Sequence, residues 1–278
     1  MSRNKDRLGG HQPEHTETPM QFNPLNFVAP TEFVELPSCG RGYPEGHPLH
    51  GQETIEIKFM TAKEEDILTS QALLKKGLAL DRFLENIIIN KSVRPDDLII
   101  GDKNAILIAA RGSGYGYDYE TTVTCPECNT KNRMEFDLRS PKVIGEFNVD
   151  QTIVTQINNE TYSTVMPFSK FTIQFRLMTG ADENVLAKAF SNSPESSEPN
   201  LLTGQFKRLI TSLEGHTEQS IIDQYVENMP TVDSRHFKIC LRSITPNVEI
   251  KETLNCKSCG FEKEVEVPFG TDFFWPDL

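Results

Sequence analysis

The stretch LNCKSCGFEKEVEVPF, residues 254–269, poses the main question about the fold, because a Cys-x-x-Cys pair is followed by the alternating pattern of a strand. Two residues between cysteines let one tight turn direct both sulfur atoms at a single metal ion. One pair supplies only half of a tetrahedral site, so the other two ligands must lie elsewhere in the chain. The segment VTCPEC, residues 123–128, contains a second pair with the same spacing. The candidate ligands are therefore Cys125, Cys128, Cys256 and Cys259.

An internal repeat indicates how the two pairs meet. FTIQFRLMTGADENVLAKAF, residues 171–190, aligns without a gap with the segment that begins ETIEIKFMTAKEEDIL at residue 53, so that Met178-Thr179 falls on Met60-Thr61. In each half, a strand pattern leads to helical patterns, then to a helix that enters the cysteine hairpin, such as 232–244 in the second half. The same order of elements in both halves favours an internal duplication.

The expected elements follow from local patterns. Thr61 followed by Glu64 is typical of a capping box that opens a helix, and helical patterns recur in both halves. We expect strands around both cysteine pairs, a strand at Thr54–Phe59, and helices at 80–89, at 104–114, at Phe206–Leu213 and at Gln219–Met229.

The sequence thus predicts an α+β fold of two pseudo-repeated halves that share one four-cysteine, zinc-ribbon-like site. The expected division is a polar, disordered N-terminal arm at 1–25, a Gly/Pro-rich loop segment at 26–52, a first α+β repeat at 53–145 and a second at 146–278. A Ser/Pro/Glu loop near 191–200 accounts for most of the extra length of the second repeat.

Zinc suits four thiolates, and a closed shell of four sulfur ligands leaves no position for a substrate or an activated water. We therefore expect one structural Zn²⁺ per chain. Three alternatives remain open at this point: a separate metal ion for each pair with histidine ligands, a redox-active Cys-x-x-Cys, and structural disulfides. No histidine lies within ten residues of either pair, and the flanking strand patterns do not provide the helix N-terminus that lowers a redox thiol's pKa.

The formal charge is −12, from 28 basic and 40 acidic residues, which opposes binding to nucleic acid or to an anionic membrane. No stretch approaches the roughly 18 apolar residues of a membrane span, and we expect a cytoplasmic protein. The glycines of RGSGYGYDY, residues 111–119, do not follow G-x-G-x-x-G, so a loop is expected there. Motifs for catalysis are missing from the sequence, so we expect a protein that is not an enzyme and has no small-molecule substrate.

Aromatic residues gather near the end of the chain in GTDFFWPDL. Phe273, Phe274 and Trp275 have two interpretations. They either cover the chain's own core or dock as an aromatic anchor in the groove of a partner protein.

Several motifs in order give the chain a family resemblance: LPS-x-G-x-x-YP at Leu36–Pro44, the MTAKEEDIL run, LLKKG-x-ALDR-x-LE at Leu73–Glu85, the Ile100–Gly116 segment, both cysteine pairs, and the closing VPF-x-x-DFFWP. Together they make the chain similar to the baseplate hub assembly protein family of T-even-like contractile-tailed bacteriophages.

The resemblance implies a viral protein that helps to assemble the central hub of the tail baseplate by binding hub proteins. Such a protein would act in the host cell cytoplasm as an assembly factor or chaperone. The alternative is a structural hub subunit that is retained in the virion baseplate. The resemblance supplies no catalytic residues.

Overall fold

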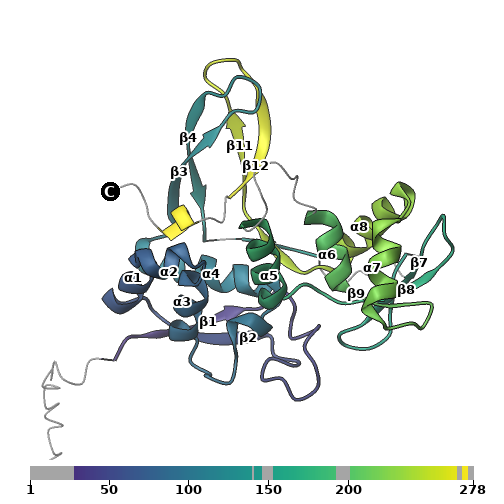
Figure 1. Ribbon diagram of the computed structural model, residues 1–278. Helices are drawn as coiled ribbons and strands as arrows, with labels where there is room; N and C mark the ends of the chain where they lie inside the picture. Colours follow the sequence, from purple (N-terminus) through teal and green to yellow (C-terminus); the bar gives the residue numbers. More distant parts are fainter. Residues whose placement is uncertain (1–27, 140, 146–152, 192–200, 268–270, 275–278) are drawn as a thin grey trace, which may run out of the picture.

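The computed structural model describes residues 28–139, 141–145, 153–191, 201–267 and 271–274. Helices alternate with small sheets, and two hairpins project side by side from the body of the molecule (Figure 1). The predicted α+β class is confirmed. The predicted arm at 1–25, most of the Ser/Pro/Glu loop and Trp275 lie outside the described residues.

The first half begins with an antiparallel hairpin of β1 (Thr31–Glu35) and β2 (Thr54–Lys58). Helices α1 (Ala62–Thr69), α2 (Gln71–Lys75) and α3 (Ala79–Ile87) follow, then the 3-10 turn η2 (Pro95–Asp97) and α4 (Ile100–Tyr115). Helix α4 leads into the hairpin of β3 (Asp118–Thr124) and β4 (Lys131–Asp137).

The second half is built around a four-stranded antiparallel sheet in the order β6-β7-β8-β9. Its strands are β6 (Thr155–Gln156), β7 (Tyr162–Val165), β8 (Thr172–Phe175) and β9 (Ile210–Leu213). Its helices are α5 (Gly180–Ser191), α6 (Leu201–Leu209), α7 (Gln219–Glu227) and α8 (Thr231–Ile244). The hairpin of β11 (Lys251–Asn255) and β12 (Glu262–Glu266) follows, then the 3-10 turn η3 (Thr271–Phe274).

A capping motif at the aligned Met-Thr positions occurs in both halves. The Glu64 carboxylate accepts hydrogen bonds from the Thr61 N–H and hydroxyl at 3.0 and 2.6 Å, and pairs with Lys58 at 2.7 Å. The Asp182 carboxylate accepts from the Thr179 N–H and hydroxyl, both at 3.1 Å, and pairs with Arg176 at 2.6 Å. Both carboxylates are buried, and each satisfies free N–H groups at a helix start.

A second pair of buried carboxylates fixes the helices that enter the cysteine hairpins. Asp102, the third residue of α4, accepts hydrogen bonds from the Ser38 N–H and the Tyr43 hydroxyl at 2.9 and 2.7 Å. Asp233, the third residue of α8, accepts from the Phe168 N–H at 2.7 Å. Asp233 follows Asp102 by 131 positions, as Cys256 follows Cys125. The structural equivalence therefore extends from the strand hairpins to the cysteine pairs.

The halves also contact each other directly. Strand β5 (Lys142–Ile144) pairs with β10 (Asn247–Glu249), and the buried Lys103 ammonium lies 2.8 Å from Glu183 of α5. One cluster of buried apolar side chains contains residues of both halves. Burial of this shared apolar surface is the main term that favours folding.

Three local predictions differ from the structure. The helical pattern at Phe206–Leu213 splits, because β-branched Ile210 and Thr211 enter β9, which pairs with β8. The expected loop at the glycines is the end of α4, where a Cβ on Gly112 would lie 2.4 Å from the Tyr117 ring. Strand β1 lies within the segment interpreted as a Gly/Pro-rich loop, and it pairs with β2.

Substitution of Asp182 tests the capping motif. Burial alone raises the pKa of this carboxyl, but hydrogen bonds from Arg176, the Thr179 N–H and Arg208 outweigh it and lower the pKa to about 2. We expect Asp182→Asn to lower the free energy of unfolding at pH 7 by on the order of 2 kcal/mol. Because the folded pKa is depressed, this stabilisation is present above the unfolded pKa of about 4 and is lost as pH falls through about 2.

Urea unfolding of wild type and variant between pH 7 and pH 2 measures the difference. Glu45→Gln, at an exposed carboxylate, is the control and leaves stability unchanged. Equal stability of wild type and Asp182→Asn at pH 7 would contradict the assigned role.

Candidate metal centre

The two cysteine pairs lie in turns of identical construction at the tips of the projecting hairpins. The Cys125 N–H donates to the Thr130 carbonyl and the Asn129 N–H donates to the Cys125 carbonyl, both at 2.9 Å. In the other hairpin the Cys256 N–H donates to Phe261 and the Gly260 N–H to Cys256, again at 2.9 Å. Each turn places a residue with positive φ directly after the second cysteine, Asn129 at 55° and Gly260 at 71°. Asn and Gly are the residues that adopt this conformation at least cost.

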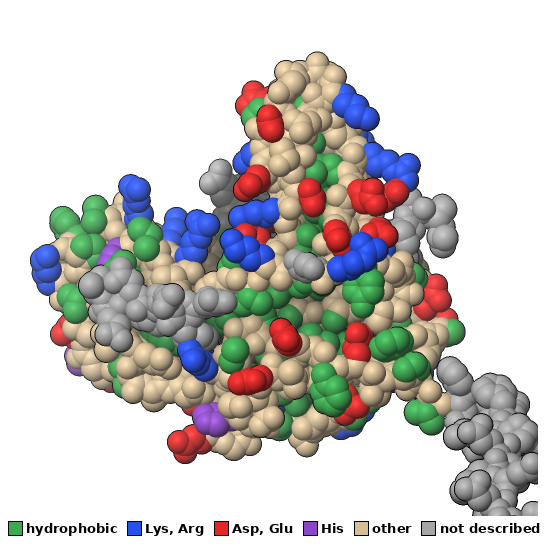
Figure 2. All heavy atoms as spheres, turned by 180° about the vertical axis from the view of Figure 1, so that it is seen from behind, with side chains coloured by type: hydrophobic (Ala, Val, Ile, Leu, Met, Phe, Trp, Pro, Cys, Tyr) green, Lys and Arg blue, Asp and Glu red, His purple; other side chains and the backbone are tan. Residues whose placement is uncertain are grey.

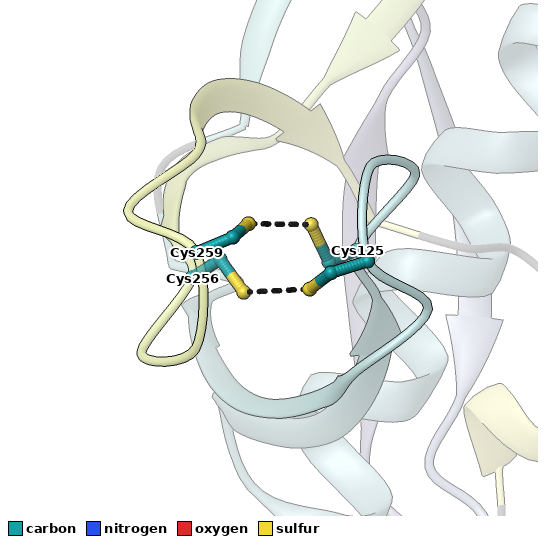
Figure 3. A group of neighbouring side chains, drawn as sticks. Cys125, Cys256 and Cys259 are labelled. Carbon is teal, nitrogen blue, oxygen red and sulfur yellow. Dashed lines mark hydrogen bonds between the residues drawn. The ribbon is translucent and has the colours of Figure 1, made fainter.

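The four sulfur atoms converge on one point (Figure 3). The Sγ atoms of Cys125 and Cys259 are 3.7 Å apart, those of Cys128 and Cys256 are 3.5 Å apart, and all four lie within 4.8 Å of one another. Four sulfurs at 2.3 Å from a tetrahedral ion would be separated by about 3.8 Å. Disulfide sulfurs are about 2.05 Å apart, and all four cysteines are free. The donor set and its dimensions fit one metal ion, as the predicted shared site requires.

The pKa values of the clustered thiols also indicate a site for a cation. N–H groups of Cys259 and Ser258 donate to the Cys256 sulfur and lower the pKa of that thiol to about 6. The Phe261 N–H lowers the pKa of the Cys259 thiol, but the neighbouring sulfurs of Cys128, Cys256 and Cys125 outweigh it and raise that pKa to about 12. Four thiolates at these distances repel one another, so a bound cation is needed to keep all four charged.

The surroundings of the cluster hold the two turns together. Asn132 of β4 donates its side-chain amide to the Cys256 sulfur at 3.6 Å, and its side-chain oxygen accepts from the Lys257 N–H at 3.3 Å. Cys125 and Cys256 are buried, whereas Cys259 is exposed. Asn132 therefore links the first hairpin to the turn of the second and orients a ligand, as partners of metal ligands commonly do. No sequence motif marks this residue, because its spacing from the cysteines fits no recognised pattern.

Phe273 and Phe274, near the end of the chain, pack against the body of the molecule. Phe273 and Phe274 are buried, with ring centroids 5.0 Å from Tyr119 and Phe83 respectively. The buried Arg111 guanidinium donates to the Phe273 carbonyl at 3.0 Å. Both phenylalanines thus cover the chain's own core, and the docking interpretation remains a prediction for Trp275.

The other two cysteines lie away from the cluster. Cys39 is exposed. Cys240 is buried beside Thr164 and His236, and burial raises the pKa of its thiol. It packs in the core as a small apolar side chain, as buried free cysteines commonly do.

The structural roles of the buried carboxylates Asp102, Asp182 and Asp233 are not predictable from a sequence motif. Their only signal is position, three residues into a helix, and only the Thr61-Glu64 pair matched a recognised capping motif.

In the part of the chain that the structure describes, no helix is long and apolar enough to cross a lipid bilayer.

Comparison with models of protein families gives a match that spans most of the chain. The model of a protein family described as "T4 bacteriophage base plate protein" matches residues 31–275, which is most of the chain. No curated protein and no solved structure matches the chain.

Removal of one ligand tests the shared site. We expect Cys256→Ser to abolish stoichiometric metal binding and to destabilise both halves together, because one ion serves both hairpins. Elemental analysis of the purified chain measures the metal, and hydrogen exchange of α4 and α8 reports each half separately.

Cys39→Ser is the matched control, since this cysteine is exposed and distant from the cluster in the turn after β1. It should keep one metal ion per chain. A single shared ion would be contradicted if, in Cys256→Ser, α8 lost its protection from hydrogen exchange while α4 kept full protection.

Proposed function

The chain belongs to the T4 bacteriophage base plate protein family, and we propose that within the phage base plate it serves assembly of the central hub, as a non-enzymatic assembly factor that binds hub proteins. Membership of the family supports a role in the base plate. The assignment to the hub rests on the resemblance of the sequence motifs. The assignment as a binding protein rests on the chemistry of the four-cysteine cluster.

The closed four-cysteine cluster is the observation that carries the proposal. We take the ion to be Zn²⁺, one per chain, because four thiolates in a tetrahedral arrangement suit zinc. A zinc ion with four sulfur ligands has no open position for a substrate, so its role would be to fasten the two hairpins together. A fastened, rigid body is the property that a protein acting through its surface requires.

The buried ionisable groups also support binding over catalysis. Glu64, Asp102, Asp182 and Asp233 are each the third residue of a helix, and all four accept hydrogen bonds from backbone N–H groups and from side chains. A pocket of about 490 Å³ between α3 and α5 contains Asp81 and Asp96, but the Asn184 amide donates to both. These carboxylates therefore serve structure, and none is left as a free general base.

Surface charge supports a protein partner over nucleic acid. Exposed carboxylates outnumber exposed lysines and arginines on both hairpins, and they include Glu127, Glu135, Asp137, Glu262, Glu264 and Glu266. They oppose the approach of phosphate groups. On this proposal the protein acts in the host cytoplasm while the base plate forms.

Quantitative mass spectrometry of purified phage particles tests the proposal. Particles are produced by a phage that lacks this chain and is supplied with it from a plasmid, and the chain is counted against the other base plate proteins. An assembly factor should be required for infectious particles and yet be present at much less than one copy in each.

Plasmids encoding Cys256→Ser and Cys39→Ser give the matched comparison, of which only the second should restore particles. A constant count of several copies per particle would instead identify a structural subunit retained in the base plate. Assembly of normal particles without the chain would refute both.

A further inference from the structure

Helix α8 presents an exposed face that joins apolar and basic side chains. This α8 face consists of Val232, Arg235, Lys238, Ile239 and Arg242. Val232 and Ile239 are 56% and 49% exposed, and the spacing of the five residues places them along one side of the helix. The adjoining turn adds Phe168, which is 67% exposed. A large apolar side chain beside an exposed apolar helix face is typical of a protein contact surface.

The cations of the α8 face have no partners among the described residues: Arg235, Lys238 and Arg242 form neither a side-chain hydrogen bond nor an ion pair there. The only acidic residue of α8, Asp233, is buried and accepts from the Phe168 and Ser169 N–H groups. In Figure 2 the end of the molecule that carries β7, β8 and α8 shows hydrophobic and basic side chains and few acidic ones. A local positive surface on a chain of charge −12 favours an acidic partner.

The first half shows what covers the equivalent helix. With the spacing of 131 that relates Asp102 to Asp233, the positions Lys238, Ile239 and Arg242 correspond to Leu107, Ile108 and Arg111 of α4. All three α4 residues are buried, at 5%, 2% and 1% exposed. The turn η3, with its two buried phenylalanines, contacts α4, and Arg111 donates to the Phe273 carbonyl. In α4 this arginine position therefore holds an aromatic segment against the helix, while in α8 it is uncovered.

From this comparison we propose that the α8 face binds an acidic, aromatic segment of another base plate protein. The occupant is chemically similar to TDFFWPDL, residues 271–278, whose described part covers α4. Its aromatic side chains would cover Val232 and Ile239, a backbone carbonyl would accept from Arg242, and carboxylates would pair with Arg235 and Lys238. A polynucleotide would leave the two aliphatic side chains without apolar contact.

This inference rests on the proposed function, because that function makes the partner a base plate protein. Its test does not depend on virus production. A fluorescent peptide of sequence TDFFWPDL is titrated with the full-length, metal-loaded chain at low salt, and fluorescence anisotropy measures binding. We expect saturable binding that becomes about tenfold weaker in the double variant Arg235→Glu/Arg242→Glu.

Two controls give the result its meaning. Lys75→Glu/Lys76→Glu, at exposed lysines of the first half, should bind the peptide as wild type does. The peptide TDSSSPDL, without aromatic residues, should bind more weakly than TDFFWPDL. Circular dichroism and the thermal unfolding midpoint should be unchanged in all variants, since the altered side chains are exposed.

Several outcomes would overturn the proposal. One is the absence of saturable peptide binding. Another is equal peptide binding by wild type and the α8 variant, which would indicate that the peptide displaces η3 from α4 and does not bind the α8 face. Tighter binding of a single-stranded oligonucleotide that the α8 variant loses would assign the face to nucleic acid. A dimer in sedimentation that the variant abolishes would assign it to a second copy. Because none of these measurements involves particles, a negative result here leaves the assembly role to be judged by the particle count.

Discussion

The convergence of four thiolates on one point is the constraint on which the rest of the structure depends. The sulfur atoms come from turns that are distant in the sequence, and at separations of 3.5 to 3.7 Å they can be charged together only around a cation. Structural zinc contributes on the order of 10 kcal/mol in small domains, which is comparable with the whole stability of a typical domain. One ion can therefore determine how the two hairpins, and the helices that enter them, lie relative to each other.

Each half uses buried carboxylates to place the elements that carry the cysteines. Asp102 and Asp233 connect the start of α4 and of α8 to the strand hairpin of the same half. Glu64 and Asp182 cap α1 and α5 and form ion pairs with Lys58 and Arg176 at the end of the preceding strand. The repeat thus preserves polar contacts whose loss would leave buried groups without partners. The halves differ on the outer side of the last helix, which is covered by η3 in the first half and exposed in the second.

Much of the site could be predicted from the sequence, because spacing alone carries the information. Two Cys-x-x-Cys pairs on alternating patterns, with an aligned Met-Thr segment before each, were sufficient to predict one shared cluster. Tertiary contacts decided the rest. Ile210 and Thr211 continue a helical pattern but lie in β9, which pairs with β8, and α4 continues through Gly112, where the Tyr117 ring leaves no space for a Cβ. Asn132 touches a ligand only across the interface of the hairpins, which no local pattern can encode.

The central claim is that one metal ion is held by four sulfurs from both halves. X-ray absorption spectroscopy of the purified chain at the zinc edge tests this most directly, since it reports the kind, number and distance of the ligands. We expect one zinc per chain with four sulfur ligands at about 2.3 Å and no nitrogen or oxygen ligand. Two ions per chain, or a shell that includes nitrogen or oxygen, would contradict it, because each hairpin would then bind its own metal.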